Sequence, residues 1–181
     1  MNIPNLLTLL RIILVPIIVI LLIQGSFVKA LIVFFVAGIS DALDGFLARI
    51  LNQQTVLGAY LDPIADKALL ASSFITLSVL HIIPSWLAVI VISRDFIILL
   101  GIAVLSMMSI PVQIRPIFVS RVTTALQLIT VLMALTSRCL PGNINASWLL
   151  AIYWVTALFT IISGLNYMAR GVALINRTGK K

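Results

Sequence analysis

The sequence has little charge and few of the side chains on which soluble enzymes usually rely. Only 9% of its 181 residues are charged, glutamate is absent, and cysteine and histidine occur once each, as Cys139 and His81. Soluble domains carry about 25% charged residues. One cysteine excludes an internal disulfide, and one histidine without partner residues argues against a zinc cluster and a Ser-His-Asp hydrolase. We therefore assign no catalytic role to His81 or Cys139.

Apolar residues, by contrast, make up 62% of the chain. A membrane span needs roughly 20 of them in a row. Six segments approach that length, and the third is short unless it begins near Gly58. They are residues 6–24, 27–49, 69–83, 85–110, 116–140 and 148–170. The N-terminus lacks a cleavable-signal pattern, so we expect the first helix to be retained. The sequence thus predicts an all-α integral membrane protein with six transmembrane helices, forming a single domain over residues 1–181.

Six spans would put both termini on one side of the membrane. Of the 12 basic residues, Lys29 and Arg138 then lie on the other side, and Arg94 lies within a span. The positive-inside rule makes the side with the remaining basic residues cytoplasmic. The net charge of +7 is spread thinly, which favours anionic lipid headgroups over nucleic acid. We expect a multi-pass protein of the cell inner (cytoplasmic) membrane, with the active site facing the cytoplasm.

The acidic residues are five aspartates, and four of them fall between residues 41 and 66. An uncompensated acid at the centre of a span costs roughly 2.5–3.5 kcal/mol. Asp41 and Asp44 are spaced i, i+3, and Asp62 and Asp66 are spaced i, i+4, so each pair shares one face of a helix. Carboxylates without histidine or cysteine suit hard divalent ions such as Mg²⁺ or Mn²⁺. Two such ions are a common device for displacement at phosphorus.

Other interpretations of the acidic and small residues are possible. Intramembrane acids also occur in carboxylate-lined ion transporters, but there they are spread through the membrane depth, often in two matching halves. No inverted repeat is visible here. A non-catalytic membrane assembly factor would explain the hydrophobicity but not four spaced aspartates. Glycine and alanine beside the acids have a second explanation, which is close helix packing.

The segment Asp41-Ala-Leu-Asp44-Gly45-Phe-Leu-Ala48-Arg49, eight further residues, and Gly58-Ala-Tyr-Leu-Asp62-Pro-Ile-Ala-Asp66 resembles the signature of CDP-alcohol phosphotransferases (CDP-alcohol phosphatidyltransferases). The resemblance implies a six-helix membrane enzyme, a homodimer, that uses CDP-diacylglycerol and releases CMP. It implies that Asp41, Asp44, Asp62 and Asp66 bind two metal ions, and that Asp66 is also the general base. It further implies that Gly45, Ala48, Arg49 and Gly58 line the CDP site.

Three further segments bear on the acceptor alcohol. Asn5, Thr8 and Arg11 form a polar stripe, which points either to headgroups or to the active site. That first segment is similar to the enzymes that make phosphatidylglycerophosphate and cardiolipin. Ile92-Ser93-Arg94-Asp95 and residues 116–127 resemble the cardiolipin-forming group, although Arg121 and Thr123 replace lysine and asparagine there.

We expect Arg94 and Arg121 to contact the acceptor phosphate; the alternative for Arg94 is a buried ion pair elsewhere, since Asp95 does not share its helix face. Phosphatidylglycerol is the favoured acceptor, and glycerol 3-phosphate is the alternative.

Overall fold

The computed structural model describes the backbone of residues 3–51, 56–107, 118–140, 142 and 145–178, and the side chains of residues 9–40, 65, 67–101, 119–140, 142, 145–171 and 173. Within these ranges the chain forms six helices and no strand, which confirms the all-α prediction. The helices are α1 (Ile3–Ile23), α2 (Phe27–Leu51), α3 (Val56–Val79), α4 (Ser85–Met107), α5 (Phe118–Cys139) and α6 (Ala146–Thr178).

Most of the helix ends lie close to the predicted ones, and the third helix differs most. It begins at Val56 rather than at residue 69, so Gly58 and both aspartates of the second pair are helical. Pro63 lies within it, although proline disfavours a helix interior. The predicted segment had started after the acids because the polar residues before Leu69 reduce its hydrophobicity. The sixth helix also extends further, to Thr178.

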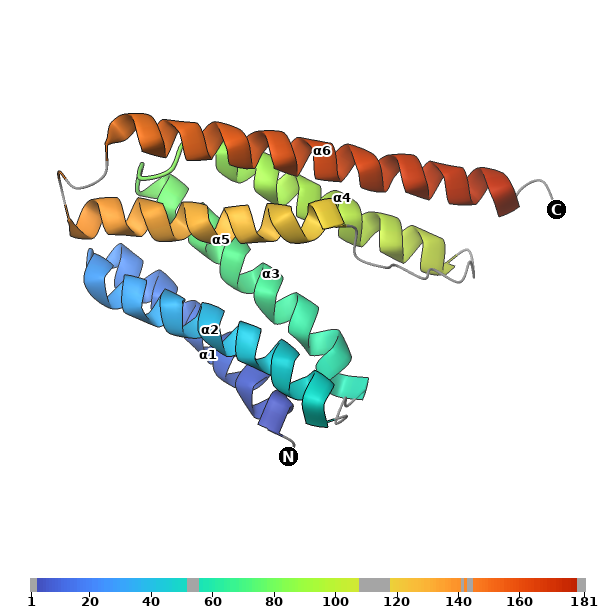
Figure 1. Ribbon diagram of the computed structural model, residues 1–181, viewed down its shortest axis with the longest axis horizontal. Coiled ribbons are helices and arrows are strands. Elements are labelled where there is room, and N and C mark those ends of the chain that lie inside the picture. Colours follow the sequence, from blue (N-terminus) through green and yellow to red (C-terminus); the bar gives the residue numbers. More distant parts are fainter. Residues whose placement is uncertain (1–2, 52–55, 108–117, 141, 143–144, 179–181) are drawn as a thin grey trace.

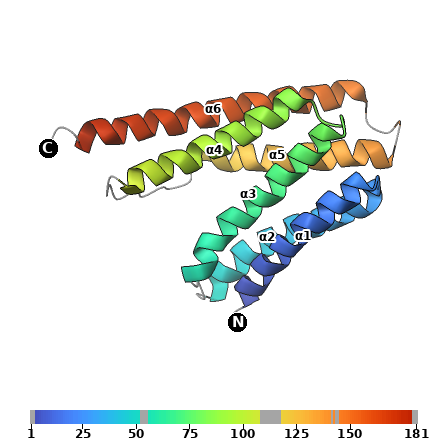
Figure 2. The ribbon, with the colours of Figure 1, turned by 180° about the vertical axis from the view of Figure 1, so that it is seen from behind.

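The helices form two groups that converge at one end of the molecule (Figure 1). Helix α1 packs on α2 and α3, whereas α6 packs on α4 and α5, and α2 joins the groups by packing on α5. The view from behind shows the same divergence of α1–α3 from α4–α6 towards the chain termini (Figure 2). Both termini lie away from the convergent end.

The buried core occupies the convergent end. All six helices contribute to it through residues near the connections at 24–26, 80–84 and 140–145. Its side chains include Ile18, Leu22, Ala30, Phe34, Phe74, Leu77, Leu87, Val91, Leu135 and Tyr153. Alanines such as Ala30 and Ala37 are fully buried, which allows α2 to approach its neighbours closely. In the helix segments that carry the aspartate pairs, only the side chain of Ala65 is described, and it is fully buried.

Helix C-terminal caps fix two of the connections. Gly25 has a φ of 70°, and the amides of Gly25 and Ser26 donate to the carbonyls of Leu22 and Leu21. His81 has a φ of 54° and stands in the same position after α3. This arrangement of hydrogen bonds closes a helix and normally uses glycine, since other residues are strained at positive φ.

Large apolar side chains are exposed on all six helices. Ile23, Val79, Val89 and Trp148 each expose more than 60% of their surface. Among the described residues, two helical stretches are long and apolar enough to cross a membrane, Val119–Cys139 and Ala146–Gly171. Leu9–Ile23, Phe27–Ser40 and Lys67–Val79 are shorter apolar stretches. So much exposed apolar surface is typical of a surface that meets another apolar phase.

Candidate active site and the polar network beside it

The aspartates of the signature lie on two helices that are consecutive in the chain. Asp41 and Asp44 belong to the last part of α2, and Asp62 and Asp66 belong to the first part of α3. Both stretches are helical, so i, i+3 and i, i+4 spacing places each pair on one helix face. The end of α2 and the start of α3 lie at the same end of the molecule (Figure 1).

The side chains of these four acids lie outside the described residues, as do those of Arg49 and the neighbouring small residues of the signature. Among the side chains that are described, no group of three acids, histidines or cysteines could hold a metal. The donor set itself fits a hard cation, because four carboxylates on adjoining helix ends supply only oxygen. The predicted roles of Gly45, Ala48, Arg49 and Gly58 stay predictions.

Arg94, in the middle of α4, is the best-defined polar residue next to this region. Its side chain is 6% exposed. Its Nη1 donates to Asp95 Oδ1 at 2.6 Å, and its Nη2 donates to the hydroxyls of Ser120 at 2.7 Å and Ser163 at 2.8 Å. One guanidinium thus links α4 to α5 and α6.

The expectation that Asp95 could not pair with Arg94 was wrong. Adjacent residues point to different sides of a helix, but the long arginine side chain curls back to reach the carboxylate. Ser120 and Ser163 hold the guanidinium in that position. The Nε of Arg94 is buried and has no hydrogen-bond partner among the described atoms. A buried donor without a partner is costly, and Arg94 keeps one such N–H among the described atoms.

Lys67 connects this network to the aspartate segment. It directly follows Asp66, and its Nζ lies 3.1 Å from Asp95 Oδ1. This contact is an ion pair without the alignment of a hydrogen bond, because Nζ has no hydrogen-bond partner among the described atoms. Two cations therefore share one oxygen of Asp95, whose side chain is 14% exposed. A carboxylate so placed offsets part of the cost of burying both cations.

Two further residues of α6 contact the side chain of Arg94. The ring of Tyr167 has its centroid 5.9 Å from Arg94 Cζ, within the range of a cation–π contact. Gly164 leaves room for the aliphatic part of the arginine, because a Cβ there would lie 3.5 Å from Arg94 Cγ. No pattern in the sequence singled out Ser163, Gly164 or Tyr167. They lie about 70 residues from Arg94, and nothing in a single sequence couples them to it.

The start of α5 separates into two faces. Ser120, Thr123 and Gln127 face the interior: Ser120 binds Arg94, Thr123 reaches the carbonyl of Phe159 at 3.2 Å, and Gln127 reaches Thr160 at 3.5 Å. Arg121 lies on the other side of the helix and is exposed. The polar residues that resembled an acceptor motif thus serve largely to pack α5 on α6. Arg121 keeps its guanidinium open to an anionic group.

The polar stripe of α1 is turned inwards where it is described. Arg11 is 1% exposed and is the largest fully buried side chain among the described residues. This position contradicts the headgroup-facing interpretation for Arg11 itself. The side chains of Asn5 and Thr8 lie outside the described residues.

Comparison with known proteins agrees with this arrangement. The family model described as CDP-alcohol phosphatidyltransferase matches residues 1–162. The chain is 36% identical over 187 residues to the "Cardiolipin synthase (CMP-forming)" proteins of Rattus norvegicus and Homo sapiens, a match that covers 94% of this chain. It spans 61% and 62% of the length of those two proteins.

A bacterial relative matches over nearly its full length. The chain is 31% identical over 185 residues to "CDP-diacylglycerol--glycerol-3-phosphate 3-phosphatidyltransferase" of Bacillus subtilis, which covers 93% of this chain and 94% of that protein. The name of the mammalian relatives gives cardiolipin as the product, whereas that of the Bacillus relative gives glycerol 3-phosphate as the acceptor. The family match includes the aspartate helices together with Arg94, Asp95 and Ser120, and it ends one residue before Ser163. The chain therefore belongs to the CDP-alcohol phosphatidyltransferase family.

Proposed function

We propose that this protein transfers the phosphatidyl group of CDP-diacylglycerol to an alcohol and releases CMP, as a step of phospholipid biosynthesis. Its family membership carries this proposal, together with the two aspartate pairs on the adjoining ends of α2 and α3. In the reaction the acceptor oxygen bonds to the β-phosphorus, the P–O bond to CMP breaks, and the hydroxyl proton leaves. Phospholipid biosynthesis also accords with the names of the relatives above.

Asp41, Asp44, Asp62 and Asp66 would hold two divalent ions, Mg²⁺ or Mn²⁺. When bound, such ions neutralise the pyrophosphate charge and stabilise the leaving phosphate. Asp66 would accept the proton of the attacking hydroxyl as general base. Gly45, Ala48 and Gly58 leave backbone accessible to the CDP moiety, and Arg49 would bind one of its phosphate oxygens.

The acceptor would bind near Arg94 and Arg121, with Asn5 and Thr8 as further polar contacts. Arg94 is linked through Asp95 to Lys67, the residue that follows Asp66, and its Nε has no hydrogen-bond partner among the described atoms. Arg121 is exposed one residue after Ser120, which binds Arg94. Both can interact with a phosphate by charge-assisted hydrogen bonds. Charge alone does not distinguish a phosphodiester from glycerol 3-phosphate.

We favour phosphatidylglycerol as acceptor, which would give cardiolipin, and keep glycerol 3-phosphate as the alternative. The two mammalian relatives show the higher identity, whereas the Bacillus relative matches over nearly its full length. A lipid acceptor would reach the site sideways from the bilayer. Glycerol 3-phosphate would come from water and bring more charge.

The proposed setting is the cell inner membrane, with residues 1–181 as one domain. Six spans with both termini cytoplasmic would place the aspartate-bearing helix ends at the cytoplasmic face. The exposed apolar side chains on all six helices support embedding in lipid. A homodimer is part of the proposal and can be checked by mass measurement in detergent.

Product identity is the test of this function. The purified protein is given CDP-diacylglycerol with phosphatidylglycerol, glycerol 3-phosphate, serine or inositol phosphate, one at a time and then in competition. We expect CMP release with phosphatidylglycerol and formation of cardiolipin. Entry of labelled glycerol 3-phosphate into lipid, without reaction of phosphatidylglycerol, would replace the acceptor by the alternative. No CMP release with any acceptor would refute the enzymatic proposal.

A further inference from the structure

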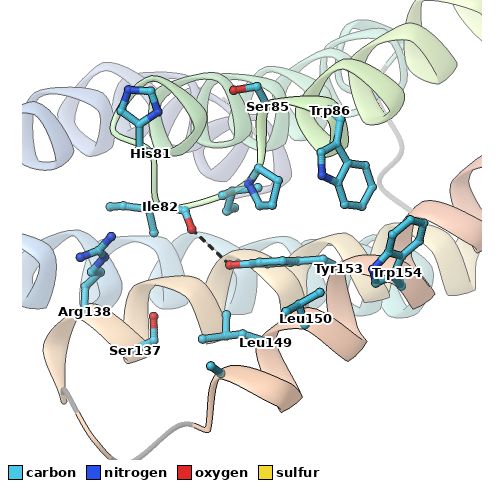
Figure 3. A pocket seen from close by; sticks show the side chains of 13 residues that line it. His81, Ile82, Ser85, Trp86, Ser137, Arg138, Leu149, Leu150, Tyr153 and Trp154 are labelled. Atoms are coloured by element: carbon cyan, nitrogen blue, oxygen red, sulfur yellow. Dashed lines mark hydrogen bonds between the residues drawn. The ribbon is translucent and has the colours of Figure 1, made fainter.

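A cavity of about 640 Å³ lies among the helix connections at the convergent end of the molecule, away from the aspartate-bearing ends of α2 and α3 (Figure 1), and Figure 3 shows it from close by. It is formed by the turn after α3, the start of α4, the end of α5 and the start of α6. This volume is within the range of small-molecule binding sites, about 300–1,000 Å³. None of the residues assigned to the reaction lines it.

The lining has a cationic side and an apolar side. Figure 3 shows His81 and Arg138 on one side of the cavity and Trp86 and Trp154 on the other. Arg138 and His81 are both exposed, and no acidic residue is among the described residues that line the cavity. Helices α4 and α6 begin at its edge and α3 and α5 end there, so the helix dipoles oppose one another and Arg138 supplies the positive charge. The cavity therefore favours an anionic group.

The buried hydroxyl group in the cavity lining already has a hydrogen-bond partner. Tyr153 is buried, and its hydroxyl donates to the carbonyl of Ile82 at 3.2 Å. The remaining lining towards Trp154 is apolar and includes Leu149 and Leu150. His81 is held at this site by a left-handed backbone position that normally belongs to glycine. A residue kept at such a position despite the strain is consistent with a role for its side chain.

The aromatic side fits the boundary of a membrane. The rings of Trp86 and Trp154 lie 5.1 Å apart and are inclined by 35°. Tryptophan is enriched at the level of lipid headgroups, where one part of the ring is apolar and the other is wet. A ligand in this cavity would thus have its charge at Arg138 and its apolar part beside Trp154.

We propose that this cavity binds an anionic phospholipid, with its phosphate between Arg138 and His81 and the upper part of an acyl chain along Trp154 and Leu150. This inference rests on the proposed membrane embedding, and it places the site in the leaflet opposite to the active site. Free phosphate would use only the cationic side of the cavity. The apolar side, with exposed Trp154 and Leu150, is the reason for choosing a lipid.

Native mass spectrometry of the protein in an uncharged detergent tests the proposal. The protein is offered equal amounts of phosphatidic acid and phosphatidylcholine with identical acyl chains. We expect preferential retention of phosphatidic acid, and about a tenfold loss of that retention in Arg138→Ala. Lys29→Ala is the matched control, because Lys29 is an exposed cation near the same end of the molecule but outside the cavity. The Lys29→Ala protein should retain phosphatidic acid as well as the unmodified protein does.

A second variant reduces the volume of the cavity and leaves its charge unchanged. Ala146→Trp places a large ring into the cavity lining and should also reduce lipid retention. If Arg138→Ala does not give a folded protein by size-exclusion chromatography, Ala146→Trp tests whether the lipid binds in this cavity. Equal retention of the two lipids, or equal retention by the Arg138→Ala and Lys29→Ala variants, would overturn the proposal.

Two further outcomes would identify a different occupant. Displacement of phosphatidic acid by millimolar inorganic phosphate would show a phosphate site instead of a lipid site. Conversion of a dimer into a monomer by Ala146→Trp would show that a second copy covers the cavity. CMP release is measured on the same preparations. If the protein releases CMP normally but does not retain phosphatidic acid preferentially, only this inference is refuted. Intact lipid binding without CMP release refutes only the proposed function.

Discussion

Lys67 on α3 and Asp95 on α4 form an ion pair in which Nζ and Oδ1 are 3.1 Å apart. The same oxygen also accepts a hydrogen bond from Arg94. One carboxylate of α4 thus holds the middle of α3, where Lys67 directly follows Asp66, and the buried guanidinium together. The position of the proposed general base relative to the proposed acceptor site therefore depends on Asp95.

Replacing Asp95 with Asn should destabilise the protein and impair acceptor binding. The change leaves Arg94 in a buried position without its counter-ion, which typically costs about 3–5 kcal/mol. We expect a lower melting temperature in detergent and a higher KM for the acceptor, with a smaller change in the KM for CDP-diacylglycerol. Asp95→Glu keeps the charge and should retain most of the stability. An unchanged melting temperature in Asp95→Asn would show that the pair is not needed.

Gly164 should tolerate alanine but not leucine. An added Cβ meets Arg94 Cγ at an ordinary contact distance of 3.5 Å. Alanine in place of glycine within a helix is favourable by about 0.5–1 kcal/mol. Leucine would extend into Arg94, and such overpacking costs about 1–3 kcal/mol. Gly171→Leu is the control, since no described atom lies within 4 Å of the position that a Cβ would take there. Equal melting temperatures for both leucine variants would contradict this contact.

Removal of divalent metal should abolish CMP release. Four aspartates without histidine or cysteine form an oxygen donor set for hard cations. Chelator should stop the reaction, and added Mg²⁺ or Mn²⁺ should restore it, as measured by CMP formation with phosphatidylglycerol. Full activity in excess chelator would refute the two-metal proposal.

Asp66→Asn should lose turnover while it still binds CDP-diacylglycerol. A general base contributes mainly in the transition state, so its loss lowers kcat more than it weakens substrate binding. Asp41→Asn and Asp62→Asn are the comparison, because both should weaken metal binding as well. Single-turnover CMP release and equilibrium binding of CDP-diacylglycerol measure the two effects. Near-normal turnover of the Asp66→Asn protein would assign the base to another group.

Arg121→Ala should raise the KM for the acceptor more than the KM for CDP-diacylglycerol. Loss of a charge-assisted contact to phosphate typically costs about 1.5–3 kcal/mol. Arg121 is exposed, and no intramolecular contact is described for its guanidinium, so its removal should leave the fold unchanged. Arg170→Ala, which removes an exposed cation of α6, serves as control. Equal increases in both KM values would argue against a specific acceptor contact.

The amino-acid sequence alone was sufficient to establish the helical class, the signature and the spacing of its acids. These features are local: hydrophobic runs set the helices, and i, i+3 or i, i+4 spacing places acids on one face of a helix. Apolar content alone places the start of α3 at residue 69, because the aspartates make the beginning of that helix polar, whereas the alternative start near Gly58 lies close to the observed one. Hydrophobicity then indicates a loop, although the backbone remains helical from Val56 onwards.

The surroundings of Arg94 and the cavity beside Arg138 and Trp154, in contrast, became apparent only from the packing of the helices. The partners Ser120 and Ser163 come from α5 and α6, and Lys67 comes from α3. Contacts between these residues depend on how the helices cross, and no local sequence pattern determines the crossing. The pairing of Arg94 with its neighbour Asp95 depends on a side-chain conformation that distant hydroxyls stabilise. Burial of a guanidinium requires that all these groups converge, because each unpaired polar atom in an apolar interior costs free energy.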